Sequence, residues 1–186
     1  MEDKNVLSYI KDVLENMPMA WFDLTTYRLD IYDEKLAKTE FIEQFEALYL
    51  ANDATAASLS ALPTAYDYIR LGHPLSCILE WLIGNLNDLK ANNVISFSSR
   101  TIPILAILRK NLLDNKNTQI LYAGELPSCF DAEVIRSVYG YKFELQQVEN
   151  NDLLTGFDGS TIFVSHQEDM RSINLNPNVD FFIGLH

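Results

Sequence analysis

A short polar turn near the middle of the chain carries the side chains best suited to binding an anion. Ser98, Ser99, Arg100 and Thr101 follow an apolar run and precede Pro103. A helix N-terminus favours an anion through its free backbone N–H groups and its dipole, and an arginine adds a bidentate fork for phosphate or carboxylate. We therefore predict that these four residues bind phosphate. The competing interpretation is a Ser or Thr N-cap beside a solvent-facing arginine.

Two further side chains have the chemistry for proton transfer. Glu125 and His166 each follow a predicted strand, and a carboxylate and an imidazole of near-neutral pKa suit general acid and base roles. If the protein is an enzyme, we expect these two residues to be catalytic. Each also has a structural interpretation, because surface-turn carboxylates are usually solvated and a lone histidine more often caps a helix.

These residues would meet only if strands bring them to one edge of a sheet. Beyond residue 93 the apolar pattern predicts strands at 94–97, 119–123, 142–148, 161–164 and 179–185, and helices at 102–113 and 128–138. Such alternation predicts an α/β fold: a Rossmann-like, mostly parallel sheet of about five strands, covered by helices on both faces. Ligands bind at the carboxyl ends of such strands. The turn at 98–101, Glu125 and His166 all lie there.

The N-terminal part of the chain is predicted to be helical. Apolar residues recur at helical spacing over 5–16, 33–51 and 74–89, whereas 27–32 fits either an extended segment or a loop. Residues 52–64 are small and polar and fit a loop or a weak helix. We therefore predict a helical N-terminal region at 1–64 and an α/β domain at 65–186.

Helix ends can also be predicted in the second half of the chain. Ser128 is expected to cap the helix at 128–138, with Asp131 at the capping-box position, and Gly140 stands just past its end. His73 is expected in a turn before the helix at 74–89.

The amino-acid composition limits the classes of partner that the protein is expected to bind. The 186 residues carry 14 basic and 26 acidic side chains, a formal charge of −12, which disfavours nucleic acid and anionic membranes. No signal peptide or apolar span is evident, so a cytoplasmic location is expected. Cys77 and Cys129 lack metal-ligand spacing, and no Gly-rich cofactor loop occurs. We predict no metal and no cofactor.

One family resemblance covers about residues 74–186. Val94–Leu105, Gln119–Ala123 and Glu125–Pro127 resemble the regulatory-subunit fold of translation initiation factor 2B and the related isomerases of methylthioribose and ribose phosphates. Gly140–Phe143 and Val179–Gly184 occupy corresponding places. The resemblance implies a Rossmann-like fold with a helical N-terminal region and a sugar-phosphate ligand.

The chain departs from the isomerase pattern at functional positions. No catalytic cysteine stands near Ser98–Thr101, Leu126 replaces the motif arginine, and Leu185-His186 replaces the acid after the last strand. These departures remove the isomerases' own catalytic groups, while anion binding is retained as an expectation.

A second resemblance points to another family. Tyr68–Leu75 followed by Ser98-Ser99 is similar to a run in the pyridoxal-phosphate lyases of cysteine and methionine metabolism. Arg100 replaces the glycine of that run, and no lysine follows the last strand to form a Schiff base. This resemblance implies a catalytically incomplete fragment.

Together these observations predict a non-catalytic or regulatory binding module for a phosphorylated small molecule. The alternatives are a small sugar-phosphate isomerase using Glu125 and His166, or the incomplete pyridoxal-phosphate-enzyme fragment. The apolar breadth of the helix at 74–89 and the aromatic segment at 21–32 predict a homodimer.

Overall fold

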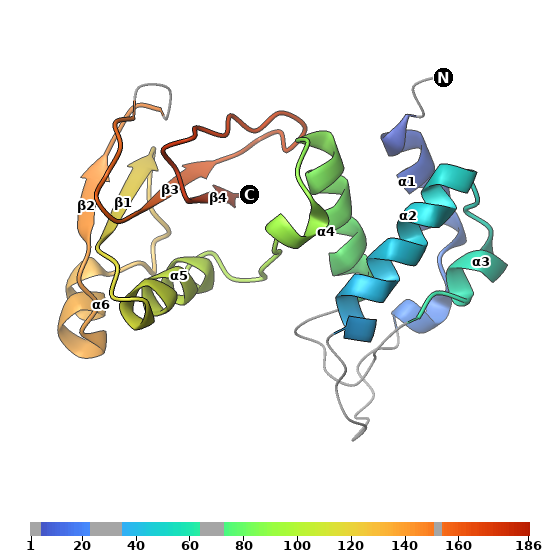
Figure 1. Ribbon diagram of the computed structural model, residues 1–186, viewed down its shortest axis with the longest axis horizontal. Coiled ribbons are helices and arrows are strands. Elements are labelled where there is room, and N and C mark those ends of the chain that lie inside the picture. Colours follow the sequence, from blue (N-terminus) through green and yellow to red (C-terminus); the bar gives the residue numbers. More distant parts are fainter. Residues whose placement is uncertain (1–4, 23–34, 64–72, 151–153) are drawn as a thin grey trace. The chain divides into compact units, whose positions relative to one another are not determined.

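The computed structural model describes residues 5–22, 35–63, 73–150 and 154–186, with the backbone alone for 35–37. The chain forms two compact units, residues 1–96 and residues 97–186, each with its own core. Figure 1 shows helices in the first unit and a sheet with helices in the second.

The N-terminal unit is helical, as predicted. Its elements are α1 (Val6–Asn16), η1 (Met19–Trp21), the π-helix η2 (Lys35–Glu40), α2 (Phe41–Ala51), α3 (Ala56–Ser60), α4 (Pro74–Leu86) and η3 (Ala91–Asn93). The segment predicted at 27–32 lies outside the described residues.

Aromatic rings fill the core of this unit. The ring of Trp81 on α4 packs edge-on against Phe45 and Tyr49 of α2, at centroid distances of 5.2 and 5.0 Å. Trp21 is 1% exposed and meets Phe41 in the same way. The apolar face of α4 therefore packs within its own unit, so the breadth of that face does not by itself require a partner.

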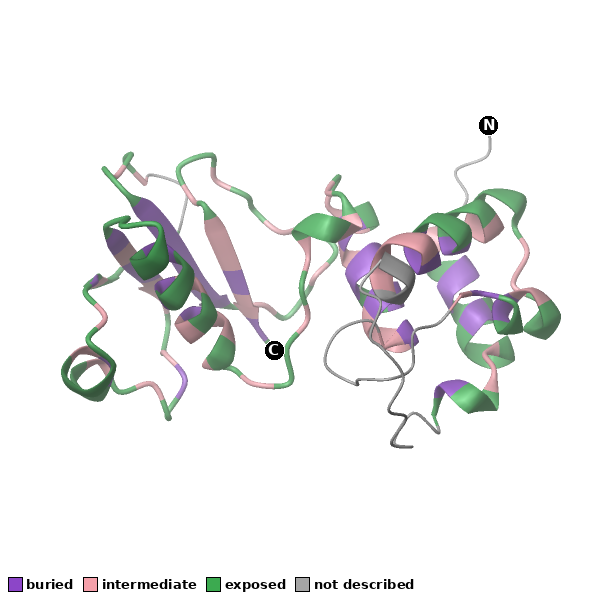
Figure 2. Cartoon of the chain, turned by 60° about the horizontal axis from the view of Figure 1, so that its bottom comes forward, coloured by how far each residue is buried: buried purple, intermediate pink, exposed green. Residues whose placement is uncertain are grey.

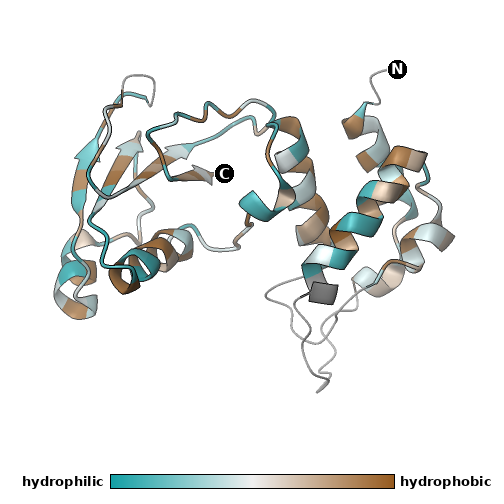
Figure 3. Cartoon of the chain, in the orientation of Figure 1, coloured by the Kyte–Doolittle hydropathy of each residue, from teal (hydrophilic) through white to brown (hydrophobic). Residues whose placement is uncertain are grey.

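The C-terminal unit is the predicted α/β fold. It contains α5 (Ile102–Leu113), β1 (Thr118–Ala123), α6 (Ala132–Tyr139), β2 (Glu144–Gln147), β3 (Ser160–His166) and β4 (Phe181–Leu185). All strand pairs are parallel, in the order β2-β1-β3-β4. The hydrophilic strand β2 lies at one edge (Figure 3), and β3 is the most continuously buried strand (Figure 2).

Both helices of this unit pack on the same face of the sheet. Alternate strand residues share one core with α5 and α6: Ile120, Tyr122, Ile162, Val164, Ile183 and Leu185 from the sheet, and Ile104, Leu108 and Ile135 from the helices. On the other face, a Cβ on Gly184 would lie 3.0 Å from Met170 Cε and 3.3 Å from Gln167 Cγ. Within the described residues, loop side chains take the place of the second helical layer that the alternating pattern predicts.

The strand predicted at 94–97 is wrong. Val94 N–H donates to the Ala91 carbonyl at the end of η3, and Ser96 N–H donates to Glu80 Oε1 at 2.7 Å. Ile95 is 60% exposed and Phe97 is 45% exposed. The backbone donors of this run are thus used by a turn and a side chain, so the described sheet has four strands.

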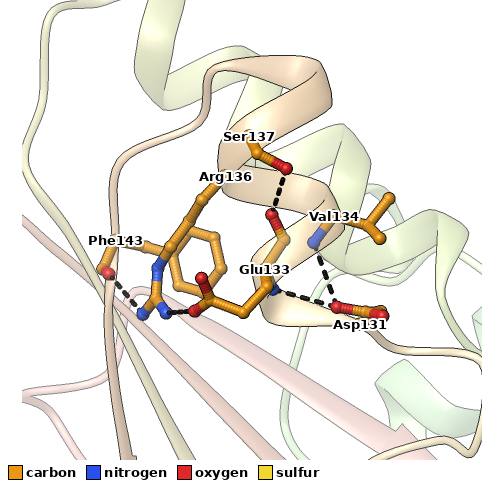
Figure 4. Close-up of polar contacts among 6 residues, drawn as sticks. All are labelled: Asp131, Glu133, Val134, Arg136, Ser137 and Phe143. Carbon is orange, nitrogen blue, oxygen red and sulfur yellow. Dashed lines mark hydrogen bonds and ion pairs between the residues drawn. The ribbon is translucent and has the colours of Figure 1, made fainter.

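Two predicted boundaries also change. The predicted domain boundary at 64/65 falls on residues outside the described part, and α4, assigned above to the α/β domain, belongs to the N-terminal core. Helix α6 begins at Ala132, so its N-cap is Asp131 rather than Ser128. The Asp131 carboxylate accepts from Glu133 N and Val134 N, each at 3.0 Å (Figure 4). Gly140 ends the helix at φ +72°, as predicted.

Arg136 holds the end of α6 to the chain that enters β2. Its guanidinium bonds Glu133 Oε1 at 2.9 Å and the Phe143 carbonyl at 3.2 Å (Figure 4). It also lies 4.6 Å from the centroid of the Phe143 ring, a favourable cation–π distance. The first crossover of the sheet is fixed by these contacts.

Candidate functional site

The turn before α5 is organised by Ser99. Its hydroxyl accepts from the backbone N–H groups of Thr101 and Ile102, at 3.4 and 3.3 Å. Pro103 stands in the first turn of the helix and has no N–H to offer. The N-cap residue of α5 is Thr101, whose own side chain makes no cap hydrogen bond, so Ser99 supplies the acceptor for the N–H groups of Thr101 and Ile102.

Arg100 points to the carboxyl end of the sheet. Its Nη2 donates to the backbone carbonyl of His186 at 2.9 Å. Alternate residues of a parallel strand direct their backbone groups to the same neighbour, and the Leu185 carbonyl accepts from Gln167 on the β3 side. Arg100 therefore binds the main-chain oxygen of the residue that directly follows β4.

A chain of hydrogen bonds continues from Arg100 across the strand ends. His186 Nδ1 lies 2.8 Å from the Gln167 carbonyl oxygen, and Gln167 Nε2 donates to Ser165 Oγ at 2.6 Å. A carbonyl can only accept, so Nδ1 carries the proton and Nε2 of a neutral ring remains an acceptor. These contacts define the carboxyl-end rim: Ser98, Ser99, Arg100, Thr101, Ser165, Gln167 and His186.

The remaining residues of the predicted phosphate site line the same turn. Ser98 is exposed, and no hydrogen bond joins it to the residues that the structure describes. Thr101 Oγ1 lies 3.4 Å from Ser99 Oγ and 4.0 Å from Cys129 Sγ, in the loop after β1. The rim thus offers a guanidinium and an unbonded hydroxyl, and the exposed thiol of Cys129 lies beside it.

The two predicted acid–base residues are not joined. Glu125 follows β1 and His166 ends β3, the neighbouring strand, and both side chains are exposed. Neither makes a hydrogen bond or ion pair with another described residue. Among the described residues, no contact orients either side chain towards the other.

The best-organised polar cluster lies in the N-terminal unit and was missed from the sequence. Glu80 is 6% exposed. It pairs with Lys38 Nζ at 2.7 Å and accepts from Ser96 N and Ser96 Oγ at 2.7 and 2.9 Å. Burial, with the nearby Glu80 carboxylate, raises the pKa of Cys77 to about 12, so this thiol is unreactive. The sequence did hold one signal for this cluster, because Glu80 is a carboxylate on the apolar face of the helix predicted at 74–89.

His73 is another side chain with a structural role. It caps α4, with its Nδ1 accepting from Leu75 N–H at 3.1 Å, and burial lowers its pKa. This position agrees with the turn predicted before the helix.

The described residues contain no cluster of three or more His, Cys, Asp or Glu side chains that could hold a metal ion. No described helix is long and apolar enough to cross a membrane. The chain matches no family model, no curated protein and no solved structure.

Proposed function

We propose that this protein is a non-catalytic binding module whose α/β unit takes a phosphorylated small molecule at the carboxyl-end rim. The observation that carries the proposal is the position of Arg100. Its contact with the His186 carbonyl holds the guanidinium beyond the edge strand β4. This is the carboxyl edge of the sheet, where parallel sheets bind ligands, although the strand order reverses between β1 and β3. That contact uses one of five N–H donors, so the others are available to an anion.

The contacts of the turn support a particular set of donors for the proposed anion. Ser99 accepts from Thr101 N and Ile102 N, so the guanidinium of Arg100 and the hydroxyl of Ser98 are the principal donors, rather than the helix amides. The planar guanidinium group of an arginine prefers an oxyanion that offers two acceptor oxygens in one plane. The resemblance to sugar-phosphate isomerases makes a phosphorylated sugar the first ligand to test.

A binding role is favoured over catalysis by the exposure of Glu125 and His166. Because neither side chain has a partner among the described residues, no arrangement fixes a proton donor or acceptor against a bound substrate. We also propose self-association of the protein, through exposed apolar side chains on α6.

A thermal-shift panel tests the binding proposal. Ribose 5-phosphate, other phosphorylated sugars, nucleotides and inorganic phosphate are compared with their unphosphorylated counterparts. We expect phosphorylated ligands to raise Tm for the wild type and for Arg109→Ala, which removes an exposed arginine of α5, the helix that follows the turn. Arg100→Ala is expected to lose the shift.

Two outcomes would contradict this function. Equal shifts in Arg100→Ala and the wild type would remove Arg100 from the site. Turnover of a sugar phosphate that is abolished by Glu125→Ala or His166→Ala would instead establish the enzymatic alternative.

A further inference from the structure

A groove in the N-terminal unit lies between α2, α4 and η3. Its volume is about 370 Å³, within the range of ligand pockets, and it is half-open to solvent. Its apolar floor is formed by Ile42, Trp81, Leu89 and Ala91, and its polar rim by Thr39, Glu43, Glu46, Asn85, Lys90 and Asn92. The groove combines an apolar base with a rim of charge.

The floor of the groove is closely packed. Trp81 is 3% exposed, and its ring is held by edge contacts with Phe45 and Tyr49, at 5.2 and 5.0 Å between centroids. Ile42 is 9% exposed and belongs to the same core. An apolar side chain that enters the groove would meet a surface already fixed by packing, so little ordering entropy is lost there.

The rim of the groove carries more negative than positive charge among the described residues. Glu43 and Glu46 stand one turn apart on α2 and are exposed, and no ion pair joins either carboxylate to the described residues. Lys90 supplies a single positive charge at the same rim. The carboxylates of Glu43 and Glu46 outnumber the ammonium of Lys90, and the whole chain carries a formal charge of −12. The electrostatic field at the groove therefore attracts positively charged groups.

We propose that this groove is the docking site for a basic segment of a partner protein, with a leucine-like side chain on the floor and lysine or arginine side chains at Glu43 and Glu46. The half-open shape favours a side chain presented by a larger partner over an enclosed small molecule. Charge complementarity sets the choice of partner, because rim charges act on specificity and encounter rate. This inference is independent of the proposed phosphate site.

Nuclear magnetic resonance of the full chain provides a test that needs no identified partner. The probe is an acetylated peptide of alternating leucine and lysine pairs, compared with the same peptide carrying glutamate for lysine. We expect the lysine peptide to shift the indole N–H resonance of Trp81, and the side-chain amides of Asn85 and Asn92, in a saturable way. Trp21, buried in the same core, serves as the internal reference, assigned with Trp21→Phe.

Charge-matched variants separate this groove from a general attraction. Glu43→Gln combined with Glu46→Gln should weaken binding by about 2- to 30-fold, the range expected for two exposed ion pairs. Glu15→Gln combined with Glu144→Gln removes the same charge at exposed sites elsewhere and should leave the affinity within about twofold.

Three results would overturn the proposal. The first is a Trp81 resonance that does not move under the lysine peptide. The second is equal binding of the lysine and glutamate peptides. The third is equal weakening by the two double variants, which would show attraction to net charge alone.

Discussion

A buried carboxylate is tolerated only when charge and hydrogen-bond partners replace the lost water. Glu80 meets this requirement with Lys38 on one oxygen and both donors of Ser96 on the other. Lys38 also donates to the Val94 carbonyl at 3.1 Å. The cluster therefore fixes the end of the N-terminal unit, although its members lie far apart in the sequence.

Removing the charge of Glu80 tests this role. Glu80→Gln keeps the shape of the side chain but leaves the Lys38 ammonium, 24% exposed, without its counter-charge. We expect the free energy of unfolding to fall by about 2–3 kcal/mol in a denaturant titration, below the range for a fully buried pair because Lys38 retains some water. Glu144→Gln, at an exposed position of β2, should change it by less than about 0.5 kcal/mol. Equal changes in the free energy of unfolding for the two variants would show that the Glu80 cluster makes no specific contribution to stability.

At the scale of elements, the start of α4 depends on His73. Burial lowers the pKa of His73 from its ordinary value of 6.5, so folding favours the neutral ring, whose Nδ1 accepts from Leu75 N–H. For a depressed pKa the unfolded state binds more protons. This contribution to stability is therefore complete above the unfolded pKa and is lost as pH falls through the folded pKa.

The prediction concerns His73→Asn, which keeps a cap acceptor but does not titrate. We expect the wild type to lose more stability than the variant as the pH is lowered from 7 to 5, measured by denaturant unfolding at each pH. Since the carboxylates titrate alike in both proteins, the difference between the two curves isolates His73. Parallel curves would mean that His73 does not couple protonation to folding.

The sequence pattern predicts most elements of the α/β unit because their signals are local. Helix α5 was predicted at its observed bounds, and β1, β3 and β4 lie within two residues of the predicted ranges. Val94–Phe97 has the same apolar pattern but is not a strand, because Glu80 takes the donors of Ser96 from an element earlier in the chain. A local pattern carries no information on such a distant acceptor.

The candidate site was also predictable only where its contacts are local in the sequence. The cap at Ser99 follows from residue type and position. The contact between Arg100 and the His186 carbonyl depends on which strand end lies beside the turn, and the strand order is not written in any single segment. The groove around Trp81 could not be predicted from the sequence either, since its walls come from η2, α2, α4, η3 and the turn before η3.

At the scale of the whole molecule, each unit has its own core. The homodimer proposed above therefore needs an apolar surface outside those cores. Helix α6 offers one: Val134 is 45% exposed, Val138 71% and Tyr139 58%, with Val134 and Val138 one turn apart on the same side.

Light scattering of the full chain tests this surface. We expect a dimer for the wild type and a shift towards monomer for Val138→Lys, which places a charge on the α6 surface. Leu50→Lys, at a side chain 67% exposed on α2, introduces the same charge elsewhere and should remain dimeric. A monomeric wild type would remove self-association from the account.

The most direct test of the central claim is an NMR titration of ribose 5-phosphate observed at the arginine Nε–H resonances. If the carboxyl-end rim binds the phosphate, the Arg100 resonance shifts in a saturable way while that of Arg109 stays in place. Unphosphorylated ribose should shift neither. An Arg100 resonance that does not move, or that moves together with Arg109 as salt alone would cause, would contradict an anion site at the ends of β3 and β4.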